Sequence, residues 1–174
     1  MALAVCLLFD RRSERAVRSL WDRLEEVGVP SLRSHTHGRH LPHLSYAVLR
    51  RWDDDAVCDA LAGIDGGDPL ELSFDGLGVF RRGRIWLAAG VTADFVARQQ
   101  RVVEAVTASG AELHQHYRPG VWLPHCSLAP RAKTAQLPDV AAAVMDVLPL
   151  RARLDHAALI NSATGQVRPL ERLS

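Results

Sequence analysis

Apolar and polar positions along the chain follow two periods, and each period predicts a different kind of element. Short runs that alternate or stay apolar predict strands, whereas apolar residues three or four positions apart predict helices. Strands are expected at residues 2–9, 41–49, 70–74, 84–91, 121–128, 153–160 and 166–173. Helices are expected at residues 12–27, 93–109 and 137–148, and from a cap at Asp53 or Asp54 through Leu61.

The two halves of the chain repeat one plan. Each half contains a strand, a long helix, a second strand and a second helix, in that order. A turn-rich segment at residues 65–69 marks the midpoint, but no low-complexity or flexible linker separates the halves. Because hairpins mix with helical connections, we expect mainly antiparallel sheets flanked by helices. The pattern predicts one bilobed α+β domain over residues 1–174, with an internal duplication.

A six-residue pattern, Pro-His-x-Ser-x-Ala, occurs twice, at residues 42–47 and 124–129. Both copies lie in predicted strands, where successive side chains point to opposite faces. The histidine, serine and alanine of each copy should therefore share one face, with room beside the alanine, while the apolar residues between them face a core. A single His-x-Ser is common by chance and is usually a half-buried polar residue, whereas two copies in register predict a functional pair.

The chemistry of the repeated residues suits the cleavage of a phosphodiester. Histidine exchanges a proton near neutral pH, so His43 and His125 are predicted to serve as one acid and one base. Ser45 and Ser127 are predicted to donate hydrogen bonds to the non-bridging phosphate oxygens. This chemistry requires no metal and no cofactor. The sequence leaves open which histidine is the acid.

The paired motifs, about half a chain apart, resemble those of the 2H phosphoesterases, most closely the bacterial 2'-5' RNA ligase or RNA 2',3'-cyclic phosphodiesterase group. Residues 70–91, with Phe-Asp-Gly-Leu-Gly-Val-Phe followed by Ile-Trp-Leu, resemble the central strand pair of that family. Residues 117–125 resemble its approach to the second motif. Both hydroxyls are serine here, where threonine is commoner in the family, and either offers one O–H donor.

The resemblance implies a pseudo-two-fold fold in which the two motif strands face each other across a central cleft. It also implies hydrolysis of RNA or nucleotide 2',3'-cyclic phosphates to 2'-phosphates, with reversible 2'-5' RNA ligation. One alternative is a phosphoesterase of a small nucleotide, such as ADP-ribose cyclic phosphate or a 2'-5' oligoadenylate. A second alternative is a non-catalytic module that binds the terminal phosphate of RNA, although such a module is expected to have lost one histidine.

Four further residues are candidates for substrate binding, and each is weighed against a role without contact to the substrate. Arg131 follows the second motif and is either a phosphate ligand or a solvated loop arginine. Tyr117 and Arg118 precede that motif, where an aromatic ring can stack on a base and a guanidinium can bind phosphate. Phe80 is either a stacking platform or a core residue. The arginines at positions 81, 82 and 84 form either a solvated hairpin tip or an extension of an RNA path.

Composition narrows the class of partner. The chain has 174 residues, 48% of them hydrophobic, with 21 basic and 20 acidic residues and a net charge of +1. So even a balance argues against a duplex-DNA-binding protein. Of the partners that the resemblance implies, RNA ends and small nucleotides, it gives weight to the small nucleotides, because long RNA would favour a more basic surface. Lys133 is the only lysine, so the positive charge is nearly all guanidinium, the better bidentate phosphate ligand. Codon usage in a GC-rich genome is the alternative explanation for this excess of arginine over lysine.

The cysteines and the N-terminal run bear on location. Cys6, Cys58 and Cys126 form no Cys-x-x-Cys and leave one unpaired in any disulfide scheme, which predicts a reducing cytoplasm. Alternation turns Cys126 toward the core rather than the chemistry. Residues 2–9 are too few for a membrane span and lack a preceding basic region. We expect a cytoplasmic monomer without membrane contact.

A loop with histidines at positions 35, 37 and 40 precedes the first motif. Imidazole is a common ligand of zinc and copper. However, the loop contains no cysteine or carboxylate, so a physiological metal is not predicted. A histidine-rich metal carrier stays an alternative, while His37 or His40 at the mouth of a cleft is the other interpretation.

Overall fold

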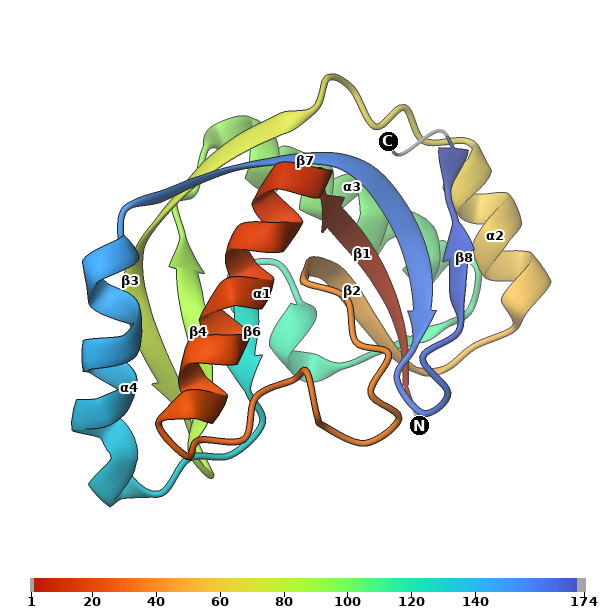
Figure 1. Ribbon diagram of the computed structural model, residues 1–174. Coiled ribbons are helices and arrows are strands. Elements are labelled where there is room, and N and C mark those ends of the chain that lie inside the picture. The colour runs from red at the N-terminus through yellow and green to blue at the C-terminus, as the bar shows by residue number, and fades with distance from the viewer. Residues whose placement is uncertain (1, 172–174) are drawn as a thin grey trace.

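The protein is described by a computed structural model over residues 2–171 (Figure 1). The strands are β1 (Leu3–Phe9), β2 (His43–Arg51), β3 (Leu70–Phe80), β4 (Arg84–Ala89), β5 (Glu112–Leu113), β6 (His125–Ala129), β7 (Leu150–Asn161) and β8 (Val167–Pro169). The helices are α1 (Arg11–Glu26), α2 (Asp54–Ala62), α3 (Ala93–Ala108) and α4 (Leu137–Val144), with 3-10 turns η1 (Gln115–Tyr117), η2 (Thr134–Gln136) and η3 (Met145–Val147).

The strands form one antiparallel network that closes on itself. Its order is β1-β2-β6-β4-β3-β7-β8, with β5 beside β2, and β1 also pairs with β7. Every strand pairing recorded for residues 2–171 is antiparallel. The expected α+β class with antiparallel pairing is confirmed. The strands belong to one sheet, because the long β7 pairs with β1 and with β3.

Local sequence explains where three of the helices begin. Asp10, Asp53 and Thr92 each accept a hydrogen bond from the backbone N–H three residues later, at 2.7, 2.9 and 3.1 Å. Such caps satisfy an N–H that has no partner within the helix. The apolar face of each helix then packs inward, as with Trp21 of α1 and Phe95 of α3, which are both fully buried.

The two long helices are exchanged between the halves. Helix α1 packs with α4 and against β6, whereas α3 packs with α2 and against β2 (Figure 1). Each therefore supports the motif strand of the other half. The Trp21 Nε1–H donates to the Ser127 carbonyl at 3.3 Å, and the Gln99 amide donates to the Tyr46 carbonyl at 3.1 Å. These buried donors hold both motif strands from behind.

Most predicted elements lie within a few residues of the observed ones, and the exceptions have local causes. Strand β3 continues to Phe80 rather than ending at residue 74, because Gly78 makes room for the Trp86 ring of the neighbouring strand. Residues 121–124 do not belong to β6, which begins only at His125. The last predicted strand is reduced to Val167–Pro169, and its residues 172–173 lie outside the described part of the chain. No described helix is long and apolar enough to cross a membrane.

Candidate active site

The two motif strands meet side by side at one residue pair. Leu44 of β2 pairs with Cys126 of β6, antiparallel, and both side chains are buried in the core. In such a pair, the residues on either side of the junction point to the opposite face. This register sets the histidine of each motif across from the serine of the other. The side chains on the shared face are His43, Ser45, His125 and Ser127.

Both histidines are oriented by the same backbone device. The Nδ1 of His43 lies 2.7 Å from the Leu41 carbonyl, and the Nδ1 of His125 lies 2.7 Å from the Leu123 carbonyl. Because a carbonyl only accepts, each Nδ1 carries a proton, which leaves Nε2 for proton exchange. The repeat therefore extends one residue further back, to Leu-Pro-His-x-Ser-x-Ala, a feature that the sequence reading missed.

The alanines of the motif do not share the face of the histidines, contrary to the expectation from strict alternation. The pairing of β1 with β2 skips Tyr46, and the pairing of β4 with β6 skips Leu128. Each skipped residue is a bulge, which changes the alternation from that point onward. Ala47 and Ala129 are in consequence buried, at 0% and 1% exposure. At both positions the small side chain packs inside the core rather than leaving space beside the site.

The first motif is enclosed by hydrogen-bond partners. The Ser45 hydroxyl lies 3.5 Å from the sulfur of Cys6, which stands opposite it on β1 and is fully buried. The phenol of Tyr117 is a second partner of the Ser45 side chain. The Trp122 indole donates to the Ser45 carbonyl at 3.0 Å. Cys6 was not predicted as a site residue, because only the β1–β2 register brings it beneath this motif.

The two histidines are shifted in opposite directions. Burial disfavours the charged form of His43, but the Cys6 sulfur and the Leu41 carbonyl outweigh burial and raise its pKa to about 9. Burial lowers the pKa of His125, and the positive charge of His43 lowers it further, against the opposing effect of the Leu123 carbonyl. Near neutral pH, His43 therefore carries the charge and His125 is the neutral imidazole.

The second motif opens onto a cavity of about 570 Å³ with an aromatic wall. The Phe80 ring stacks on Trp86 at 4.7 Å between centroids and meets the edge of His125 at 4.9 Å. A side chain at Gly78 would lie 2.1 Å from the Trp86 ring, so only glycine lets this wall form. The cavity is lined by Val48, Phe80, Arg81, Arg84, Ile85, Trp86, His114, His116, Tyr117, Val121, Leu123, His125 and Ser127.

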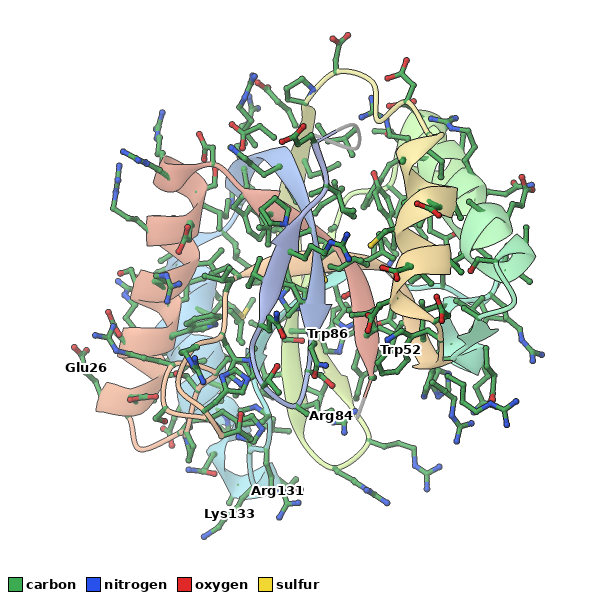
Figure 2. All side chains as sticks on the ribbon, turned by 90° about the vertical axis from the view of Figure 1, so that its right-hand side faces the viewer. Glu26, Trp52, Arg84, Trp86, Arg131 and Lys133 are labelled. Carbon is green, nitrogen blue, oxygen red and sulfur yellow. The ribbon has the colours of Figure 1, made fainter. Side chains whose placement is uncertain are left out.

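The predicted substrate contacts fall in different places. Phe80 and Tyr117 line the aromatic cavity. Arg131 lies beyond the end of β6 and, together with Ser127, lines a second cavity. Arg118 is exposed and lines neither cavity. Arg84, which the sequence left between two interpretations, lines both cavities and separates Trp86 from Arg131 in Figure 2.

The histidine-rich loop packs together without forming a metal site. His40 stacks on His37 at 4.3 Å between ring centroids and on His35 at 5.6 Å. Burial and the neighbouring imidazoles lower the pKa of His40 to about 4. Among residues 2–171, no group of three histidine, cysteine or acidic side chains is arranged to hold a metal ion. His37 and His40 line a smaller cavity with His43, consistent with a position at the edge of the site.

The fold is thus antiparallel α+β, and its two His-x-Ser pairs share one face at the junction of β2 and β6. The sequence profile of the 2'-5' RNA ligase superfamily matches residues 12–166, so the chain belongs to this superfamily of 2H phosphoesterases. No curated protein sequence matches the chain.

Solved structures share the fold over nearly the whole chain. E. coli LigT complexed with 3'-AMP matches with a TM-score of 0.63 and 18% identity, covering 97% of this chain and 94% of that chain. A crystal structure of a phosphoesterase matches with a TM-score of 0.61 and 19% identity, covering 96% and 92%. Usb1 of Kluyveromyces marxianus matches with a TM-score of 0.51 and 14% identity, covering 97% and 96%. The expected 2H phosphoesterase fold is thereby confirmed, and membership of the superfamily supports a phosphodiesterase function.

Proposed function

We propose that the protein is a metal-independent phosphodiesterase that opens 2',3'-cyclic phosphates at RNA ends or on nucleotides and leaves 2'-phosphates. The observation that carries this proposal is the pair of identically anchored histidines with opposite pKa shifts. Opening a cyclic phosphate needs one group to accept a proton and another to donate one at the same pH. His125 and His43 are matched to these two tasks.

The reaction runs as an in-line displacement at phosphorus. Nε2 of His125 takes a proton from water as the water oxygen bonds to phosphorus. The bond from phosphorus to the 3'-oxygen breaks, and Nε2 of His43 gives that oxygen its proton. The nucleoside 2'-phosphate is released, and the two imidazoles exchange one proton with solvent before the next turnover.

The hydroxyls and one arginine are assigned to the phosphate charge. Ser127 has no recorded side-chain hydrogen bond within residues 2–171, which supports it as a donor to a non-bridging oxygen. Ser45 shares its hydroxyl with Cys6 and Tyr117, which supports a weaker contribution. Arg84 is proposed as a guanidinium ligand of the phosphate, since it borders Ser127 in both cavities.

Ligation uses the same proton transfers. If a 5'-hydroxyl of RNA replaces water, His125 deprotonates it and a 2'-5' linkage forms. Cleavage of that linkage reverses the roles of the two histidines. The aromatic cavity is also compatible with a single small nucleotide, as E. coli LigT is seen with 3'-AMP. The free thiols of all three cysteines fit a reducing cytoplasm.

The test is hydrolysis of 2',3'-cyclic nucleotides and of a short RNA with a cyclic phosphate end, in excess EDTA. The protein is purified without a histidine tag, so that the histidine-rich loop carries no metal from a column. Products are compared with 2'- and 3'-phosphate standards by chromatography and mass. We expect 2'-phosphates, with EDTA leaving the rate unchanged. Formation of 3'-phosphates, a rate abolished by EDTA, or binding without turnover would contradict the proposal.

A further inference from the structure

A second cavity adjoins the proposed catalytic centre and shares lining residues with the aromatic cavity. It measures about 750 Å³, and Ser127 and Arg84 line it as well as the aromatic cavity. The two cavities therefore share a wall at the proposed position of the reacting phosphate. The lining residues of the second cavity are Gly28, Pro30, Leu32, His35, Arg82, Arg84, Ser127, Ala129, Pro130, Arg131, Lys133 and Gln136.

The second cavity is a cationic surface without a carboxylate. Its lining includes three arginines and one lysine, and neither aspartate nor glutamate. Within residues 2–171, none of these four cations takes part in a recorded ion pair, whereas seven other arginines pair with carboxylates. In a chain of net charge +1, this concentration comes from the arrangement of residues rather than from composition. The four are Arg82, Arg84, Arg131 and Lys133.

The backbone brings these cations together at a fixed contact. The hairpin tip between β3 and β4 docks on the segment after β6, where the Ala132 N–H donates to the Gly83 carbonyl at 2.7 Å. A side chain at Gly83 would lie 2.0 Å from the Ala132 carbonyl oxygen, so the close approach requires glycine. Arg82 and Gly83 both adopt positive φ, at 68° and 71°. Arg82 is thus held beside Arg131 and Lys133 in spite of their mutual repulsion.

The cationic cavity continues from the aromatic cavity through Arg84, which lines both. In Figure 2, Arg84 lies between Trp86 and the neighbouring pair Arg131 and Lys133, and all but Trp86 line the one cationic cavity. The aromatic cavity offers stacking surfaces, whereas the cationic cavity offers guanidinium and ammonium donors. Arginine in particular matches the geometry of phosphate oxygens. An anion in this cavity would neutralise charges that the protein itself leaves unpaired.

We infer that the cationic cavity is a subsite for a second phosphate, carried by the same substrate as the reacting cyclic phosphate. This inference rests on the proposed function and specifies its substrate: a nucleotide with a phosphate on the 5' side of the terminal nucleoside. An internucleotide phosphate of RNA and a 5'-phosphate of a mononucleotide share this chemistry.

Three substrates test the subsite and separate the two sources. They are a nucleoside 2',3'-cyclic phosphate, the same compound with a 5'-phosphate, and a dinucleotide that ends in the cyclic phosphate. We expect at least about tenfold higher kcat/KM for the second or third substrate than for the first, since phosphate gains charge-assisted hydrogen bonds in the subsite. A gain confined to the dinucleotide indicates RNA ends, and a gain with the 5'-phosphate alone indicates a small nucleotide.

Two double variants test whether this gain in kcat/KM comes from the cationic cavity. Arg82→Gln with Lys133→Gln should reduce kcat/KM for the phosphate-bearing substrates to nearly that of the nucleoside cyclic phosphate, which itself changes less than about twofold. The matched control is Arg15→Gln with Arg151→Gln, two exposed arginines that line neither cavity. Thermal unfolding verifies that both double variants are folded. Equal kcat/KM for all three substrates in the wild type, or a gain that survives in the Arg82 and Lys133 variant, would overturn the inference.

Binding separates failure of the subsite from failure of the proposed function. The affinity for a nucleoside 2',5'-bisphosphate is compared by calorimetry with that for the 2'-monophosphate, in the wild type and in both double variants. Absence of turnover on all substrates would refute the proposed function alone. If the wild type binds the bisphosphate more tightly than the monophosphate, and the Arg82 and Lys133 double variant does not, the subsite is still supported. Equal binding of both ligands by the wild type would refute it.

Discussion

The two His-x-Ser motifs have the same sequence pattern and the same backbone anchors but unlike surroundings. The residue opposite Ser45 is Cys6 of β1, whereas the residue opposite Ser127 is Trp86 of β4. A buried thiol and a phenol enclose the first motif, and an aromatic wall with open space beside it flanks the second. The comparison teaches that two copies of one motif acquire different environments from their neighbours rather than from their own residues.

This asymmetry is electrostatic as well as steric. Cys6 and the Leu41 carbonyl raise the pKa of His43, whereas burial and the charge of His43 lower that of His125. The charge on one histidine thus helps to keep the other neutral. In the proposed mechanism, two copies of one motif thereby supply an acid and a base.

The largest expected effect is loss of either histidine. His43→Ala and His125→Ala should each reduce kcat for 2',3'-cyclic nucleotides by about 10²- to 10⁴-fold, because each removes one of two proton transfers. His156→Ala, at an exposed histidine of β7, is the control and should retain activity. Circular dichroism verifies the fold. Normal turnover in either motif variant would refute the acid–base assignment.

Loss of a motif serine is expected to lower kcat less than loss of a histidine, and the two serines should differ in the size of this effect. Ser127→Ala should lower kcat by about 10²- to 10³-fold, as for loss of one transition-state donor. Ser45→Ala should lower it less, because Cys6 and Tyr117 already engage that hydroxyl. Ser73→Ala, at an exposed strand position, serves as the control. A larger loss for Ser45 than for Ser127 would reverse the roles assigned to the two motifs.

The smallest expected effect is a displacement of the pH profile. The proposed mechanism requires neutral His125 and protonated His43, so kcat/KM should rise as pH increases through the lowered pKa of His125 and fall through about 9, where His43 deprotonates. In Cys6→Ala the contribution of Cys6 that raises the pKa of His43 is gone, while burial and the Leu41 carbonyl remain, so the alkaline limb should move to lower pH. Cys58→Ala should leave both limbs in place. An unchanged alkaline limb in Cys6→Ala would show that the thiol does not control His43.

Local sequence carried much of the fold and the central part of the candidate site. Hydrophobic periodicity predicted most strands and helices, and capping residues such as Thr92 marked helix starts. The doubled pattern identified the facing residues of β2 and β6 without knowledge of their pairing. The roles of those residues stay predictions, but their shared face follows from the period of a strand alone.

Other features of the candidate site depend on how neighbouring strands pair, which the local sequence does not reveal. Strict alternation placed Ala47 and Ala129 beside the histidines, and the bulges after each serine turned both alanines into the core. The sequence favoured a solvated hairpin tip for Arg84, with an extension of an RNA path as the alternative. A β-bulge, and a hairpin that packs on a distant segment, are difficult to predict from the local sequence. Both depend on the neighbouring strand or segment against which they pack.

The sequence by itself therefore determined the elements, the superfamily and the repeated His-x-Ser pattern, since these depend on residue type and short-range spacing. Only the tertiary structure decided that Cys6 lies under the first motif, that Trp86 walls the second, and that Arg82 stands beside Lys133. The physical reason is that pKa values, aromatic walls and unpaired charges arise from contacts between residues far apart in the chain. Those contacts are set by strand register and helix packing, which no single segment encodes.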